Sequence, residues 1–274
     1  MKNKFILATL LLATTIVFAQ KKDKISGNKI VVDVFKTLEG FNKLQIEDNL
    51  KVNIAQTLDN GYHLKTDENL VEVVRFEVID SVLRIYSLMK ITSSKKLEIA
   101  LTFRNLEEIT LLNDSELTST SKLTLPELQF TASDDAKFDL DITTETAMLF
   151  LNNGTKGDLL LKGNKVKMIL NENAYLKGDL VSDELEITVN KRADLDLSGD
   201  VTHLQLTATG SSDIKAKKLR TTYANLNGSN SADIYINTTK ELELYMQGKS
   251  DVYVYGNPEI KVTGMNDKSK IIKK

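Results

Sequence analysis

Aspartates recur at one regular place in the second half of this sequence. Asp158, Asp194, Asp213, Asp233 and Asp251 each stand directly before an apolar residue that begins a short β-prone run. Side chains alternate along a strand, so an aspartate beside an inward apolar residue points outward. Calcium prefers several carboxylate and carbonyl oxygens, which makes four of them candidate ligands: Asp194, Asp213, Asp233 and Asp251. In the alternative interpretation, each carboxylate accepts hydrogen bonds from N–H groups of the adjoining bend.

Tyrosines gather towards the end of the sequence. Tyr235, Tyr253 and Tyr255 alternate with apolar residues over 234–236 and 252–255, which places the three rings on an outer face. An exposed aromatic strip can stack on sugar rings or contact a partner protein, so these tyrosines are the candidate ligand-binding residues. An outward aromatic ladder that only stabilises the sheet is the alternative.

Residues suited to catalysis are few. The two histidines, His63 and His203, lie far apart in the sequence and form no recognisable metal or triad motif. Paired carboxylates could serve a polysaccharide hydrolase or lyase, with Arg192 or Arg220 assisting. The pairs are Asp134/Asp135, Asp139/Asp141 and Asp194/Asp196. Because a chain with 38 Asp and Glu residues forms such pairs by chance, the sequence favours a non-enzymatic protein.

A repeat with a period of about 19 residues positions these side chains, as stacked supersecondary units require. Short apolar runs each end in a polar or small residue, and these end positions recur at nearly even steps. The positions are Asn113, Ser133, Asn152, Asn171, Asn190, Thr209, Asn227, Gln247 and Gly264. A β-prone period of this length without helical periodicity predicts an all-β fold, a right-handed parallel β-helix or solenoid of stacked rungs.

Asparagine is the commonest residue at this repeated position. In stacked parallel rungs, identical amides lie one strand spacing apart and can hydrogen-bond along the stack. We therefore expect a structural amide ladder rather than a binding site, made of Asn113, Asn152, Asn171, Asn190 and Asn227.

The regions before the repeat have different characters. Residues 1–19 have the basic start, the short apolar run and the small-residue cleavage site of a secretory signal, with cleavage before Gln20. Residues 20–105 contain alternating β-prone runs and an Asn60-Gly61 turn signal, and predict a β-rich N-terminal cap. The cap merges into solenoid repeats over 106–274. No other run is long and apolar enough for a transmembrane helix.

The composition limits the classes of metal site and binding partner that the protein can have. The chain has no cysteine, which excludes disulfides and thiolate metal sites. Its formal charge is −2, and becomes −4 when the two lysines of the signal are removed. This small net negative charge favours binding to neither nucleic acid nor an anionic membrane.

The sequence resembles a known family. The stretches that carry the resemblance are "FKTLEGFNKLQIEDNLKVNIAQ", "YHLKTDENLVEVVRFEVIDSVLRIYS", the "GSSDI"-type bends and "VYVYGNPEI". They are similar to the family of putative auto-transporter adhesins with a head GIN domain, exported proteins common in Bacteroidetes. The resemblance covers almost the whole mature chain. Bends in this chain are more polar and charged than the family's usual glycine-serine-glycine bends.

These observations together predict an exported, non-enzymatic binding or cell-envelope protein, in the periplasm or at the cell surface. It would recognise a glycan or a surface protein through the outer face of the solenoid. The first alternative is a polysaccharide-active β-helix enzyme, and the second is a structural envelope scaffold. The sequence assigns no cofactor beyond the calcium interpretation and does not indicate an oligomeric state.

Overall fold

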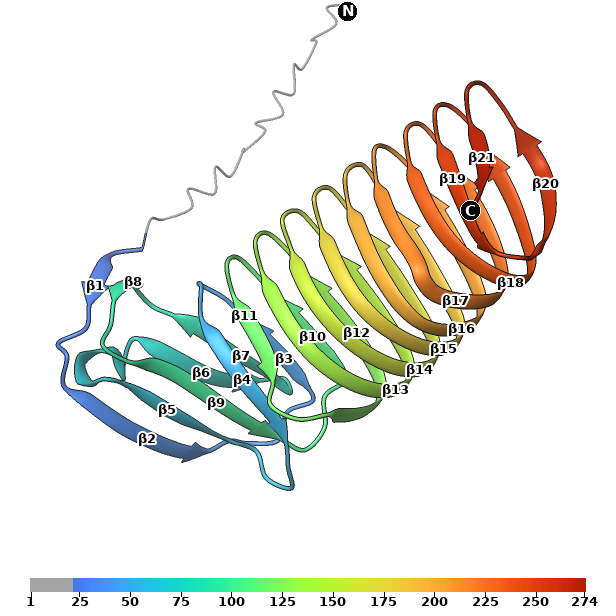
Figure 1. The fold of residues 1–274 in the computed structure, drawn as a ribbon. Helices are drawn as coiled ribbons and strands as arrows, with labels where there is room; N and C mark the ends of the chain where they lie inside the picture. The colour runs from blue at the N-terminus through green and yellow to red at the C-terminus, as the bar shows by residue number, and fades with distance from the viewer. Residues whose placement is uncertain (1–21) are drawn as a thin grey trace, which may run out of the picture.

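The computed structural model describes residues 22–274 and is built almost entirely of β-strands (Figure 1). The predicted signal over residues 1–19 lies outside the described residues. Within them, the one helical element is a 3₁₀ turn, η1 (Glu68–Leu70). No helix between residues 22 and 274 is long and apolar enough to cross a bilayer.

Twenty-one strands follow one another between residues 22 and 274. They are β1 (Lys24–Ser26), β2 (Val31–Thr37), β3 (Lys43–Ile46), β4 (Lys51–Gln56), β5 (Gly61–Asp67), β6 (Val74–Ile79), β7 (Val82–Ser87), β8 (Lys90–Ser93), β9 (Leu97–Phe103), β10 (Glu108–Leu111), β11 (Glu116–Ser119), β12 (Leu123–Ala132), β13 (Lys137–Leu151), β14 (Lys156–Leu170), β15 (Tyr175–Val189), β16 (Asp194–Ala208), β17 (Asp213–Gly228), β18 (Asp233–Met246), β19 (Asp251–Gly256), β20 (Glu259–Met265) and β21 (Lys270–Lys273).

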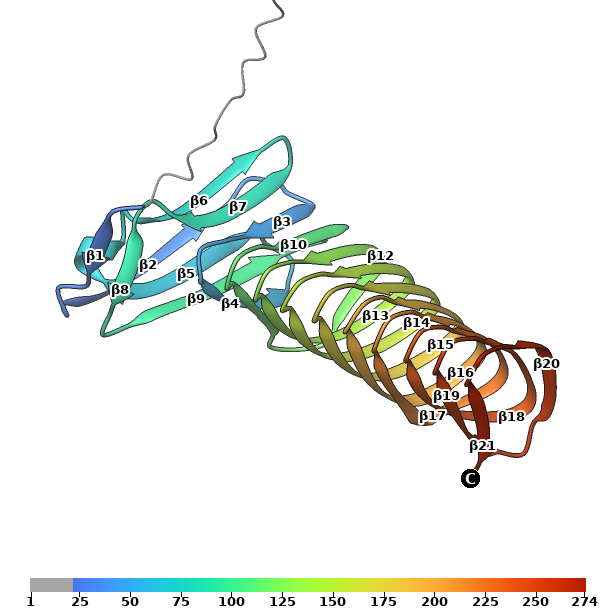
Figure 2. The same cartoon turned by 90° about the horizontal axis from the view of Figure 1, so that it is seen from above.

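Parallel pairing stacks the strands from β10 onward into a solenoid (Figures 1 and 2). Thr146 pairs with Lys165, Lys165 with Glu184, and Glu184 with His203, so each step is 19 residues by subtraction. The predicted all-β solenoid with about 19 residues per rung is therefore confirmed.

Each long strand bends once. Inward and outward residues alternate until two neighbours, Glu145 and Thr146 in β13, are both exposed, and the alternation then resumes in the opposite phase. The inward positions fill the core. At one of them, Gly157, a Cβ would lie 2.0 Å from Cζ of Phe138, so glycine makes room for that ring.

A tight turn closes each rung after the bend. One residue in each of nine turns has a positive φ: Asn113, Asp134, Asn153, Glu172, Lys191, Gly210, Asn230, Gly248 and Asp267. Two positions later stands a small buried residue: Ser115, Ala136, Thr155, Ala174, Ala193, Ser212, Ala232, Ser250 or Ser269. At Gly210 a Cβ would lie 2.2 Å from the carbonyl oxygen of Lys191, so this turn requires glycine.

Residues 22–105 cover one end of the stack and also begin it. β3 and β4 pair in parallel with β10 and β11, and therefore form a rung of the solenoid. β7 and β9 pair in parallel on their other side. Antiparallel pairs β2–β5, β5–β9 and β6–β7 complete the cap. A single buried cluster runs from Phe41 to Val254, so the cap and the rungs share one core.

Asp67 joins three segments of the cap. Its side chain is fully buried, and its carboxylate accepts N–H groups of Lys29 at 3.0 Å and of Lys95 and Lys96 at 3.1 Å. Burial acts to raise the pKa of this carboxyl, but the three backbone donors outweigh it and hold the pKa below its usual value. The charged form of Asp67 therefore stabilises the fold.

Asp67→Asn should be less stable than the parent at neutral pH, because an amide cannot accept all of these N–H groups. A lowered pKa gives stability that is present above the unfolded-state value and is lost as the pH falls through the folded-state value. The difference in melting temperature should therefore narrow in acid. A difference that stays constant between neutral and acid pH would contradict this account.

A hydrogen-bonded amide column runs along the turns. The side chain of Asn171 donates to Oδ1 of Asn152 at 2.8 Å, and that of Asn190 donates to Oδ1 of Asn171 at 2.8 Å. Ser133 ends the column on one side, where Asn152 donates to its Oγ at 3.4 Å, and Thr209 ends it on the other, where it donates to Oδ1 of Asn190 at 3.0 Å.

Two asparagines expected in this column do not lie in it. Asn113 has φ 59° and occupies the left-handed turn position, and Leu112 takes the column position in its rung. Asn227 lies within β17 opposite Thr207, two residues before Ser229, which takes the column position there. The prediction was wrong for Asn113 and Asn227 because the bend and the strand end also accept a polar residue.

Asn171→Leu should lower the free energy of unfolding by about 1–3 kcal/mol, since it removes the donor to Asn152 and the acceptor of Asn190. Asn227→Leu is the matched control outside the column and should change it by less than about 0.5 kcal/mol. Urea unfolding of both variants measures the difference. Equal decreases in the free energy of unfolding of the two variants would show that the hydrogen bonds of the column add no stability of their own.

Candidate binding surface

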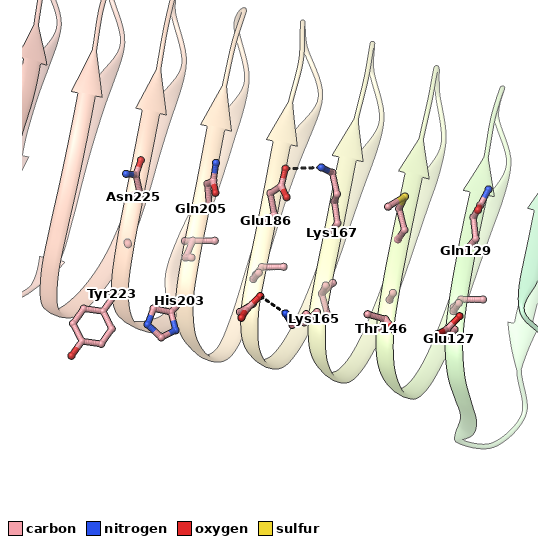
Figure 3. A pocket seen from close by; sticks show the side chains of 18 of the residues that line it. Glu127, Gln129, Thr146, Lys165, Lys167, Glu186, His203, Gln205, Tyr223 and Asn225 are labelled. Atoms are coloured by element: carbon pink, nitrogen blue, oxygen red, sulfur yellow. Dashed lines mark hydrogen bonds and ion pairs between the residues drawn. The ribbon is translucent and has the colours of Figure 1, made fainter.

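A groove of about 1130 Å³ runs across the rungs on the outer face of the stack (Figure 3). The strand segments that follow the bend form it, from β10 to β18, and Lys43 of β3 adds to it beside β10. Outward residues two apart on each strand give it two parallel columns, with buried residues such as Leu185 and Leu204 between them.

The parallel register fixes both columns. The first contains Glu127, Thr146, Lys165, Glu184, His203, Tyr223 and Glu241. The second contains Glu108, Gln129, Met148, Lys167, Glu186, Gln205, Asn225 and Glu243. From Glu108 to Glu243 the second column takes seven steps, which at ~4.8 Å per step gives a length of about 34 Å.

The groove carries more negative than positive charge. Its lining includes seven glutamates and three lysines. Each lysine is paired with a glutamate: Lys43–Glu108 at 2.9 Å, Lys165–Glu184 at 3.3 Å and Lys167–Glu186 at 2.7 Å. Figure 3 shows the last two pairs crossing from rung to rung. Every lysine of the lining is thus engaged by a neighbouring carboxylate.

A section whose lining contains no carboxylate and no lysine lies towards the β18 end of the groove. His203 stacks on Tyr223 with ring centroids 5.1 Å apart and an interplanar angle of 12°. Gln205 and Asn225 stand beside them in the second column (Figure 3). Nζ of Lys240 lies 5.5 Å from the centroid of the Tyr223 ring. Each ring therefore covers one face of the other, while both side chains remain exposed to the groove, Tyr223 by 38%.

Sequence reasoning did not find this groove. The stretch "THLQL" around His203 lies in an ordinary strand, and its His203 and Gln205 point outward. A signal was present, because polar residues two apart recur after the bend of the rungs from β12 to β18, except in β13, where Met148 takes the second place. Their types change from rung to rung, so no motif marks them.

The three candidate tyrosines lie outside the groove. Tyr235 and Tyr253 stack with ring centroids 4.4 Å apart and an interplanar angle of 7°. Nζ of Lys274 lies 5.4 Å from the centroid of Tyr253. Tyr255 stands opposite Asn237, two residues further along, and does not belong to this stack. The geometry of Tyr235 and Tyr253 matches the aromatic ladder named as the alternative, because their faces contact each other.

Four of the candidate aspartates follow one another on adjacent rungs. Asp194, Asp213, Asp233 and Asp251 are register neighbours. Asp158 is not among them: it pairs with Asp139 and Lys177, two residues further along the strand than the column. The expectation that Asp158 shares the column was wrong. Asp158 also precedes an inward leucine, but that leucine lies two residues further along its rung than the apolar residues that follow the other four aspartates.

Hydrogen bonds and lysines offset part of the repulsion in this aspartate column. The Asp213 N–H donates to Oδ1 of Asp194 at 2.8 Å. Lys215 pairs with Asp213 at 2.9 Å, and Lys270 approaches Asp251 at 3.7 Å. Within residues 22–274, no three carboxylate or imidazole groups converge as a metal ion would require. The geometry gives the calcium interpretation no support.

Asp233 is the least compensated member of the aspartate column. Burial raises the pKa of its carboxyl above the usual value, and the negative charges of Asp251 and Asp213 raise it further. A raised pKa means that the folded state binds more protons than the unfolded state, so this group's contribution to stability falls as the pH rises.

Asp233→Asn should therefore stabilise the protein at neutral pH, by less than about 1 kcal/mol because solvent screens exposed charges. The gain should vanish in acid, where the parent carboxyl is protonated in both states. Melting temperatures at the two pH values test this. A variant that is less stable than the parent at neutral pH would instead indicate that the Asp233 carboxylate is held by favourable contacts.

The residues considered for catalysis are not brought together. Arg220 pairs with Asp200 at 2.5 Å near the bend, and Nε of Arg192 donates to Oδ1 of Asn173 at 3.1 Å in a turn. His63 bonds Asp33 at 2.7 Å in the cap. The paired aspartates lie in a turn (Asp134/Asp135) and on the first halves of β13 (Asp139/Asp141) and β16 (Asp194/Asp196). None of the three pairs lines the groove.

Comparison with known proteins supplies a family. A family model described as "Putative auto-transporter adhesin, head GIN domain" matches residues 40–164 and 147–258. A solved structure from Parabacteroides merdae, described as a putative adhesin, is 20% identical with a TM-score of 0.65, and the match covers 92% of this chain and 99% of that one. No curated protein matches the chain.

Two structures from Parabacteroides distasonis are similar as well. One is described as a putative lipid binding protein, with a TM-score of 0.66 at 16% identity, and the other as a putative adhesin, with 0.62 at 17%. Each match covers 92% of this chain and 100% of the other. At these identities the likeness concerns the fold.

Proposed function

This chain belongs to the family described as "Putative auto-transporter adhesin, head GIN domain", and from that premise we propose that it is an exported, non-enzymatic binding protein whose groove holds a linear polymer. The groove's length carries the proposal: it spans about 34 Å across the rungs, far more than a small molecule occupies. The family supports an adhesive role in the envelope or at the cell surface, and the predicted signal agrees with export.

Recognition in the groove would be made by side chains. The N–H and C=O groups of β13–β17 are already paired with the rungs on both sides. A ligand therefore meets amides, carboxylates, one imidazole and one phenol rather than free backbone. Such a surface suits a chain that presents hydroxyl and amino groups at intervals, as polysaccharides do.

Screening the mature chain, residues 20–274, against immobilised linear polysaccharides and surface proteins tests the proposal. At least one linear polymer should bind, and Gln205→Ala/Asn225→Ala should weaken it by about tenfold, equivalent to 1.4 kcal/mol. Asp158→Ala/Lys177→Ala is the matched control, since both residues are exposed on the other half of the rung.

The remaining outcomes separate the alternatives. Binding that survives the groove variant but is lost in Tyr235→Ala/Tyr253→Ala would move the site to the tyrosine stack. Cleavage of a bound polysaccharide into shorter chains would favour the alternative of a polysaccharide-active enzyme. Absence of any binding would favour a structural envelope role.

A further inference from the structure

We infer that the occupant of the groove is a linear polysaccharide whose sugars carry free amino groups. This inference rests on the proposed function and concerns the section of groove between β15 and β18. There, the patch of His203, Tyr223, Gln205 and Asn225 has glutamates at all four corners. These are Glu184 and Glu186 on β15, and Glu241 and Glu243 on β18.

Charge decides between classes of polysaccharide. The three lysines that line the groove are all paired with glutamates, which leaves Lys240, whose ammonium lies over the Tyr223 ring and makes no ion pair within residues 22–274, as a cation beside this section that could hold a carboxylate, sulfate or phosphate. Glu241 pairs with Lys261 at 2.9 Å, whereas Glu127 and Glu243 make no ion pair within residues 22–274. An acidic chain would thus meet unbalanced negative charge, and a cationic chain would neutralise it.

The spacing suits a chain with charged groups at intervals. Glu184 and Glu241 stand three strand steps apart in the first column, which at ~4.8 Å per step is about 14 Å. Between them, the amides of Gln205 and Asn225 can donate to and accept from hydroxyl groups. Three of the corner carboxylates, Glu184, Glu186 and Glu241, are already paired with lysines, so a ligand ammonium would compete with those lysines there. Glu243 makes no ion pair within residues 22–274 and would meet a ligand ammonium directly, while hydroxyl groups over the centre would meet the two amides.

A cation already occupies part of this section. The ammonium of Lys240 lies 5.5 Å from the centroid of the Tyr223 ring, within the range of a cation–π contact. A ligand ammonium could take the place of this long side chain at little cost. His203 and Tyr223 cover one face of each other's ring, which confines stacking on a ligand to the faces left exposed, and the neighbouring amides and carboxylates supply polar and ionic contacts.

A lysine-rich peptide is the competing cationic ligand, and the backbone argues against it. Extended peptides gain much of their affinity by adding a strand to a free sheet edge. The strands under this section, β16 and β17, are paired on both sides, so peptide N–H and C=O groups would find few partners. A sugar chain has no such groups to satisfy along its length.

Calorimetric titration of the mature chain with four probes of equal length tests the inference. The probes are a glucosamine oligomer, its fully N-acetylated counterpart, an oligouronate and an oligolysine, used at mildly acid pH. The glucosamine oligomer should bind at least about tenfold more tightly than each of the other three, a gap of 1.4 kcal/mol or more. High salt should reduce the difference, because the Debye length falls to ~3 Å at 1 M.

Glu241→Gln/Glu243→Gln should remove most of this preference while leaving the melting temperature within a few degrees. Glu145→Gln/Asp158→Asn removes two exposed charges outside the groove and should leave the preference unchanged. Equal binding of the free and acetylated oligomers, or tighter binding of oligolysine, would overturn the inference and leave the proposed function standing. If no linear polymer binds, both this inference and the proposed function are contradicted.

Discussion

Pairing between successive rungs is the interaction on which the rest of this structure depends. A single rung cannot satisfy its own N–H and C=O groups or bury its apolar side chains, so each rung relies on its neighbours. The constant 19-residue register from Thr146 to His203 aligns equivalent residues into columns. The amide column, the left-handed turn residues, the small buried residues and both sides of the groove all result from this alignment.

The period of the fold could be predicted from the sequence because every rung repeats one chemical order of apolar run, polar residue, bend and small residue. The place of a residue within the bend could not, as Asn113 shows. Asparagine suits both a hydrogen-bonded ladder and a left-handed turn, so its identity does not separate adjacent positions. Asn227 was misplaced because the step from His203 to Tyr223 is longer than the regular step, and the sequence does not show where the extra residue lies.

The tyrosine stack and the groove both show how far a binding surface could be predicted from the sequence. Tyr235 and Tyr253 stand out in the sequence because they are alike, yet their likeness lets them stack and cover one another's faces. The groove combines unlike residues, and the parallel register after the bend brings His203, Gln205 and Tyr223 together on one outer face. Outward columns of mixed composition can be identified only once the position of the bend is known. Neither composition nor periodicity locates the bend.

The stacked rungs also determine how the molecule would respond to force. The cap and β21 stand at opposite ends of the stack (Figure 1). A pull between them acts along the hydrogen bonds that join the rungs and loads every rung-to-rung interface in series, so that rungs open one at a time. Each released rung frees 19 residues in the regular part of the stack, which extend to about 65 Å. Such a chain lengthens stepwise under tension, while the rungs that remain folded keep their part of the groove.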